Sequence, residues 1–141
     1  MYSVCIPYTV DGYEKNQWNH VLLNWNIDKI YLLSDINPRE DTWCSAPLLR
    51  GSSVSIITSV SEIPEQLVCA SPKNSSILSV TNNLNTFVHP ETCCYVFGSN
   101  SSLEFPVPEA NTVVYVDTIS ELYSWCACAI LLYDRSLKNA N

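Results

Sequence analysis

The 141-residue sequence has few charged side chains and is especially poor in basic ones. Charged residues make up 15% of the chain and hydrophobic residues 47%, and the formal net charge is −7. The only arginines are Arg39, Arg50 and Arg135. A nucleic-acid-binding surface normally carries a basic stripe that contacts phosphates. The composition therefore disfavours RNA as a partner without excluding it. The low charge also hints that a second subunit covers part of the surface.

Long apolar runs are also missing. No stretch approaches the 18 residues that a membrane-spanning helix requires. No basic segment followed by an apolar one opens the chain, so we expect no signal peptide. These absences predict a cytoplasmic protein that does not enter a membrane.

Histidines are scarce, and the cysteines are not spaced as metal ligands. The chain has 7 cysteines, with no C-x-x-C pair, and its histidines are His20 and His89. This pattern disfavours a zinc site, and we predict no bound metal. Reduced, buried cysteines that pack as small hydrophobic side chains are the simplest interpretation.

Strand-like and helix-like segments alternate, and the length suits one domain over residues 1–141. This alternation predicts an α/β fold with a mainly parallel sheet. The predicted strands are 2–9, 29–34, 53–58, 93–97 and 112–116, with further apolar runs at 66–71 and 76–81. A first helix is predicted over 14–25, with Asn26 as a left-handed end. Ser59 and Glu62 resemble a capping box for a short helix.

The last helix is predicted most clearly. Thr118 and Glu121 match a capping box, and the helical period continues to Leu137. Apolar residues occupy most sides of this segment, which is typical of a helix buried on several sides. In a chain of this length the second cover is most simply another subunit, so we expect a homodimer.

The strand 93–97 ends at Phe97-Gly98 and is followed by small polar residues. One interpretation is a loose turn after a core strand. The other is a ligand site, because ligands of open α/β sheets bind beyond the carboxyl ends of strands, and a glycine there allows close approach to the backbone.

Two segments carry a family resemblance. The first is "LNTFVHPETCCYVFGSNSSL" (84–103), and the second is "VVYV" followed by "LYSWCACAILLYDR" (113–116 and 122–135). They resemble the C-terminal half of the SpoU-like branch of the SPOUT methyltransferases. "LLNWNIDKIYLLS" (22–34) is similar to an earlier part of that family.

The resemblance implies an α/β fold with helices on both faces of the sheet and a C-terminal trefoil knot. It implies a homodimer that binds S-adenosylmethionine in the knot and methylates a ribose 2′-hydroxyl of RNA. The residues it assigns to the cofactor are Thr81, Phe97, Gly98, Ser99, Asn100, Val116 and Leu122.

Three polar motifs of the family are altered here. Asn16 matches the asparagine of the first motif, but Trp18 replaces its glycine and Leu22 its arginine. Asn100 replaces a glutamate, and Tyr123 replaces an asparagine. Leu22 and Asn100 cannot supply the guanidinium and the carboxylate that the family uses. The catalytic residues are therefore unknown, with Asn16, Asn100 and Tyr123 as the remaining candidates.

The leading hypothesis is a divergent member that binds S-adenosylmethionine or a related nucleotide, with degenerate or repurposed catalysis. One alternative is an active RNA 2′-O-methyltransferase, so whether the chain is an enzyme stays open. Others are a non-catalytic dimeric structural or interaction protein, and an unrelated α/β fold.

Several side chains allow both a structural and a functional interpretation. His89 either ties a turn before Pro90 or makes a polar contact near the knot. Asp134-Arg135 is expected to form an ion pair within the helix or between subunits. Trp18 and Trp25 fit core packing better than base stacking. Tyr123 could stack on adenine or close the pocket.

Overall fold

A computed structural model describes residues 1–9, 11–34, 51–71, 82–98, 112–118 and 122–139. Its centre is a seven-stranded sheet in which every pair of neighbouring strands is parallel. The strand order is β3-β2-β1-β6-β4-β7-β5. The strands are β1 (Tyr2–Pro7), β2 (Lys29–Leu33), β3 (Ser53–Ile57), β4 (Leu67–Ala70), β5 (Asn82–Asn83), β6 (Cys93–Val96) and β7 (Thr112–Tyr115).

The central strands are buried on both faces, as their nearly continuous apolar sequences predict. All four residues of β6 are buried, and β6 pairs with β1 on one side and β4 on the other. Tyr95 of β6 lies opposite Val4 of β1 and Val68 of β4. Each of the strands expected from the sequence is present, with ends that differ by one or two residues.

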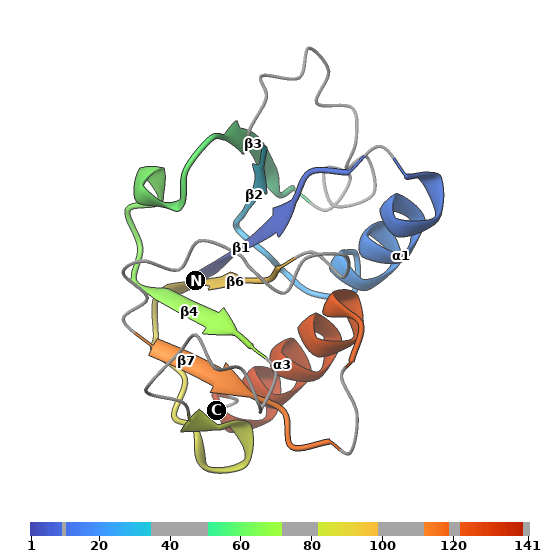
Figure 1. Cartoon of the computed structure of the whole chain (residues 1–141). Coiled ribbons are helices and arrows are strands. Elements are labelled where there is room, and N and C mark those ends of the chain that lie inside the picture. Colours follow the sequence, from blue (N-terminus) through green and yellow to red (C-terminus); the bar gives the residue numbers. More distant parts are fainter. Residues whose placement is uncertain (10, 35–50, 72–81, 99–111, 119–121, 140–141) are drawn as a thin grey trace.

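Both described α-helices pack on one face of this sheet. They are α1 (Gly12–Leu22) and α3 (Ser124–Lys138), which contact each other as well as the strands (Figure 1). Their buried side chains join the larger hydrophobic core, whose members include Val4, Ile30, Val68, Tyr95, Val114, Trp18, Leu22, Trp125, Leu131 and Leu132.

The other face has its own, smaller core. The 3₁₀-helix η1 (Val60–Glu62) and the adjoining Ile63 pack there, together with side chains of the strands. The Cys5, Cys69 and Cys94 side chains belong to this core. Burial raises the pKa of the Cys5 and Cys69 thiols to about 12, so both stay protonated and pack as small hydrophobic groups.

Helix boundaries follow local capping, with one correction to the sequence prediction. The capping box of Ser59 and Glu62 is confirmed at the start of η1. Asp11 caps α1 by accepting a hydrogen bond from the Glu14 backbone. The prediction that Asn26 takes a left-handed conformation is wrong, because no non-glycine residue in the described part of the chain has a positive φ. Leu23, which ends α1, is right-handed helical.

The last helix begins later than the capping-box pattern predicts. Thr118, Leu122 and Tyr123 are not helical, and α3 starts at Ser124 without a side-chain cap. Tyr123 has an extended backbone, with φ −59° and ψ 147°. This conformation lets its ring lie flat on that of Trp125, with centroids 5.0 Å apart. This contact joins the residue that precedes α3 to the first turn of the helix.

The order of the last strands is relevant to a knot. The short strand β5 lies at one edge of the sheet, and β7 pairs between β4 and β5, which precede it in the chain. The segments that would carry a threading, including the apolar run 76–81, lie outside the described residues. The second 3₁₀-helix, η2 (Leu84–Thr86), follows β5 directly.

Candidate functional site

The candidate ligand site lies at the carboxyl edge of the sheet. In Figure 1 the arrows of β1, β4 and β7 point to the same side of the molecule. Phe97 and Gly98 continue β6 toward this edge, and Val116 continues β7. In parallel α/β sheets this edge is where ligands bind. The described residues thus bring strand ends from distant parts of the sequence to one edge.

A hydrogen bond joins the end of β6 to the start of α3. The Ser124 hydroxyl donates to the Gly98 carbonyl oxygen over 2.7 Å. This contact ties two of the segments that the resemblance assigned to the cofactor, the one at Gly98 and the one at Leu122. The sequence analysis did not single out Ser124, although a serine that opens a helix is a common local donor.

Aromatic rings line the same junction. Trp125 is buried beneath Tyr123, and Tyr13 of α1 meets it edge-on with centroids 6.0 Å apart. Trp18 bridges Trp125 and Phe97, at centroid distances of 6.3 and 6.0 Å. The start of α1, the start of α3 and the end of β6 are therefore held together by edge and stacking contacts of aromatic rings.

The predicted catalytic candidates do not form one cluster among the described residues. Asn16 is exposed on α1, and Tyr123 is exposed at the start of α3. Leu22, which stands where the family has arginine, is only 1% exposed and belongs to the core. Thr81, Ser99 and Asn100 lie outside the described residues. Among the described cofactor candidates, Phe97 is buried, Gly98 and Val116 are half-buried, and Leu122 is exposed.

The tryptophans follow their core interpretation. Trp18 is buried, and Trp25 is half-buried against the same core. Trp18, at 3% exposure, has no open ring face for stacking on a base.

A second polar cluster lies at the amino end of β6, and it is structural. The His89 side chain is fully buried, with Nδ1 2.8 Å from the Tyr95 hydroxyl and Nε2 2.7 Å from Asp134 Oδ2. Asp134 also pairs with Lys138, one turn later on α3, at 2.9 Å. His89 therefore ties the turn before Pro90 to α3, in line with its structural interpretation.

Arg135 is the other centre of this polar cluster. Its guanidinium donates to the carbonyl oxygens of Pro90 and Glu91, at 2.6 and 2.8 Å, and to the Tyr95 hydroxyl at 2.9 Å. It also lies 4.7 Å from the centroid of the Tyr2 ring, a cation–π distance. The expectation of an ion pair is thus met for Asp134, which pairs with Lys138, but not for Arg135, which binds the Pro90 and Glu91 carbonyl oxygens and the Tyr95 hydroxyl.

The hydrogen bonds of the cluster run in one direction. Burial raises the pKa of the Tyr95 phenol, so it is neutral and has one proton to donate. Because the Tyr95 oxygen accepts from Arg135, its proton points to His89 Nδ1. Burial also lowers the pKa of His89, so the ring is neutral and its Nε2–H donates to Asp134. The protons are thus ordered from Arg135 through Tyr95 and His89 to Asp134.

Asp134, the last acceptor in this series of hydrogen bonds, is ionised. Burial acts to raise its pKa, but hydrogen bonds from His89 and Lys138 and the Lys138 charge outweigh that effect and lower it. A hydrogen-bonded network of this kind, buried at Tyr95, His89 and Arg135, makes the position of α3 on β6 specific.

Among the described residues, no group of three or more His, Cys, Asp or Glu side chains is arranged to hold a metal ion. No helix in the described ranges has the length and apolar character needed to cross a membrane.

Solved structures similar to this chain are methyltransferases at low sequence identity. An rRNA methyltransferase from Sinorhizobium meliloti aligns with a TM-score of 0.69 and 11% identity, over 99% of this chain and 57% of that one. The SpoU methyltransferase AviRb from Streptomyces viridochromogenes, solved with AdoMet, aligns with a TM-score of 0.70 and 10% identity, over 99% and 57%. The chain thus spans little more than half the length of these two proteins.

A shorter relative matches almost end to end. A putative RNA methyltransferase from Bacillus anthracis aligns with a TM-score of 0.69 and 9% identity, over 99% of this chain and 95% of that one. No protein-family model and no curated protein sequence matches the chain. The seven-stranded parallel sheet and these alignments agree with the resemblance seen in the sequence: the chain has the fold of the SpoU-like methyltransferases.

Proposed function

We propose that the protein binds S-adenosylmethionine or a related adenosine compound at the carboxyl edge of its sheet, and that it does not transfer methyl groups to RNA efficiently. The observation that carries the second half is the burial of Leu22, which is 1% exposed. A leucine inside the core offers neither charge nor hydrogen bonds to a ribose or phosphate.

The junction of Gly98 with Ser124 supports the binding half. Gly98 follows a central, fully buried strand, and its backbone is held against the start of α3 at 2.7 Å. A glycine at this place leaves room for a ligand beside the main chain. Backbone groups and aromatic rings are the groups that this site offers to a ligand. Adenosine is a ligand that such groups can recognise. When bound, S-adenosylmethionine would supply an activated methyl group.

We further propose a homodimer formed through α3, and a trefoil knot in the last third of the chain. One face of α3 is buried against the protein's own sheet, at Trp125, Cys128, Leu131, Leu132 and Arg135. A second face exposes Ile130, Tyr133 and Leu137, at 38%, 58% and 61%. These three residues follow helical spacing and form one apolar stripe that a second copy could cover.

A dimeric protein without catalysis remains a second candidate, because this apolar stripe supports association whatever the ligand site does.

Calorimetric titration with S-adenosylmethionine and S-adenosylhomocysteine tests the binding half. We expect binding by the wild-type protein and its loss in Gly98→Val. The matched control is Gly12→Val, since a Cβ added at Gly12 meets nothing within 4 Å. Absence of binding by the folded wild-type protein would reject the proposal.

Transfer of labelled methyl groups to tRNA or rRNA tests the catalytic half. We expect little or no transfer by the purified protein. Robust transfer that disappears in Gly98→Val would instead establish an active methyltransferase.

A further inference from the structure

We propose that the exposed ring of Tyr123, backed by Trp125 and flanked by Tyr13, is a stacking platform for one unpaired nucleobase. We call these three side chains the aromatic platform. The choice of ligand rests on the proposed function, whereas the site itself lies outside the residues that the resemblance assigned to the cofactor.

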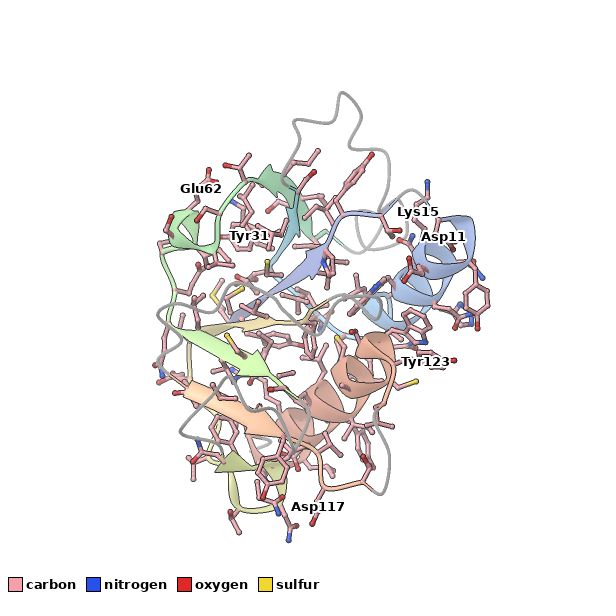
Figure 2. The ribbon with its side chains drawn as sticks, viewed as in Figure 1. Asp11, Lys15, Tyr31, Glu62, Asp117 and Tyr123 are labelled. Carbon is pink, nitrogen blue, oxygen red and sulfur yellow. The ribbon has the colours of Figure 1, made fainter. Side chains whose placement is uncertain are left out.

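The geometry leaves one tyrosine face open. Tyr123 stacks on Trp125 with an interplanar angle of 13°, yet its side chain stays 61% exposed. Trp125 beneath it is buried, and Tyr13, itself 65% exposed, meets Trp125 at 77°. Figure 2 shows Tyr123 at the start of α3, on the side of the molecule where α1 lies. The inner face of Tyr123 is therefore supported by a rigid indole, while the outer face is turned to solvent.

Large aromatic side chains normally bury most of their area, and two exposed tyrosines around one buried tryptophan concentrate aromatic rings at the ligand edge of the sheet. Because Tyr123 is already held by Trp125, a base that stacks on it needs little further ordering of the protein. The Ser124–Gly98 bond anchors the same segment to β6.

The surrounding charge favours the base over the phosphate. Asp11 caps α1 and Glu14 lies in its first turn, so both are close to Tyr13 in sequence, and Lys15 follows them. Figure 2 labels Asp11 and Lys15 at this end of α1. The whole chain has a net charge of −7. Phosphates would therefore gain little here, and stacking has to supply the affinity. We expect binding to be nearly independent of salt, unlike phosphate-driven binding.

The test measures binding of adenosine and uridine by equilibrium dialysis, with and without saturating S-adenosylhomocysteine. A single-stranded RNA of mixed sequence is the third probe. Removing one stacking ring costs roughly 1–3 kcal/mol, so Tyr123→Ala should weaken binding about 5- to 150-fold. Tyr123→Phe should retain it, because the ring is kept. Tyr13→Ala is the second variant, in case Tyr123→Ala disturbs Trp125.

The control is Val88→Ala, which truncates a side chain that is 84% exposed and belongs neither to the aromatic platform nor to the apolar stripe of α3. The molar mass of this control variant is also measured by light scattering, so that a change in its oligomeric state is detected. Binding equal to wild type in this control is expected.

The outcomes separate the two proposals. Nucleoside binding that persists with saturating S-adenosylhomocysteine and is lost in Tyr123→Ala supports the platform. The same loss in a protein that fails to bind S-adenosylhomocysteine rejects the proposed function and leaves the platform standing. Tighter, Tyr123-dependent binding of RNA identifies single-stranded RNA as the source of the base, and equal binding identifies a free nucleoside.

Three results would overturn the platform. One is displacement of the nucleoside by S-adenosylhomocysteine, which would make Tyr123 part of the cofactor site. Another is the absence of nucleoside binding at millimolar concentration. The third is RNA binding that is steeply salt-dependent and unchanged in Tyr123→Ala.

Discussion

Replacing Arg135 by methionine should remove one of the strongest connections between α3 and the sheet. The guanidinium is buried and donates to three oxygen atoms, the carbonyl oxygens of Pro90 and Glu91 and the hydroxyl of Tyr95. Methionine keeps much of the side chain's volume but donates no hydrogen bonds. The change therefore isolates the polar contribution from the packing contribution.

The magnitude follows from what each acceptor loses. The Tyr95 hydroxyl is buried, so losing its donor costs roughly 1–3 kcal/mol. The Pro90 and Glu91 carbonyls lie nearer the surface and can recover a water molecule, so each contributes less. Burying the guanidinium was itself unfavourable, and methionine removes that cost. We expect a net loss of about 3 kcal/mol in the free energy of unfolding.

Urea denaturation followed by circular dichroism measures this loss. With a slope of about 2 kcal/mol per molar urea, the midpoint should fall by about 1.5 M. Arg135→Lys keeps the charge but not the planar fork, so its loss should be intermediate. Ser136→Ala, at an exposed neighbouring position, should change stability by less than about 0.5 kcal/mol. If Arg135→Met costs no more than Ser136→Ala, the network does not hold α3 in place and our reasoning is refuted.

Four further outcomes are expected. Burial lowers the pKa of His89, so the folded protein keeps this ring neutral, and its contribution to stability is fully present above about pH 6.5. As the pH falls from there through the folded pKa, the free energy of unfolding should fall by up to about 1.4 kcal/mol per pH unit. His89→Gln should remove this pH dependence from urea midpoints measured between pH 7 and 5. Leu22→Arg would bury an unpaired charge and should cost at least about 3 kcal/mol by thermal melting, so a stable Leu22→Arg variant that methylates RNA would contradict our view of this position. Light scattering should give a dimer for the wild-type protein and a monomer for Leu137→Asp, and a wild-type monomer of 15.8 kDa would reject the α3 interface. Gly98→Val should keep the far-ultraviolet spectrum of the wild type while losing adenosine-compound binding, and unchanged affinity would remove Gly98 from the site.

The strands could be predicted because their signal is local. Buried parallel strands are short apolar runs, and 29–34, 93–97 and 112–116 are bounded by polar or turn-forming residues. The sequence pattern places the start of the last helix near Thr118, whereas α3 begins at Ser124. The sequence spacing could not show that Tyr123 has an extended backbone and stacks on Trp125.

The site was predictable only in part. The glycine after the central strand allowed a candidate ligand site to be predicted at the carboxyl edge of the sheet. The burial of Leu22 could be predicted from its position on the apolar side of α1. The bond between Ser124 and Gly98 was not predictable, because 26 residues separate them and no local pattern links them. The same holds for the ordered chain of donors from Arg135 to Asp134, which depends on the packing of α3 against β6.

The position of β6 also decides when the sheet can form during synthesis. β1 and β4 do not pair with each other, and residues 93–96 join them. A nascent chain that has emerged only as far as residue 90 therefore has two separate strand edges without their shared partner. Contacts this distant in sequence close slowly, and unpaired edges invite association with other chains. The sheet should consequently form only after residues 93–96 have been synthesised, and truncation before β6 should leave a fragment that aggregates.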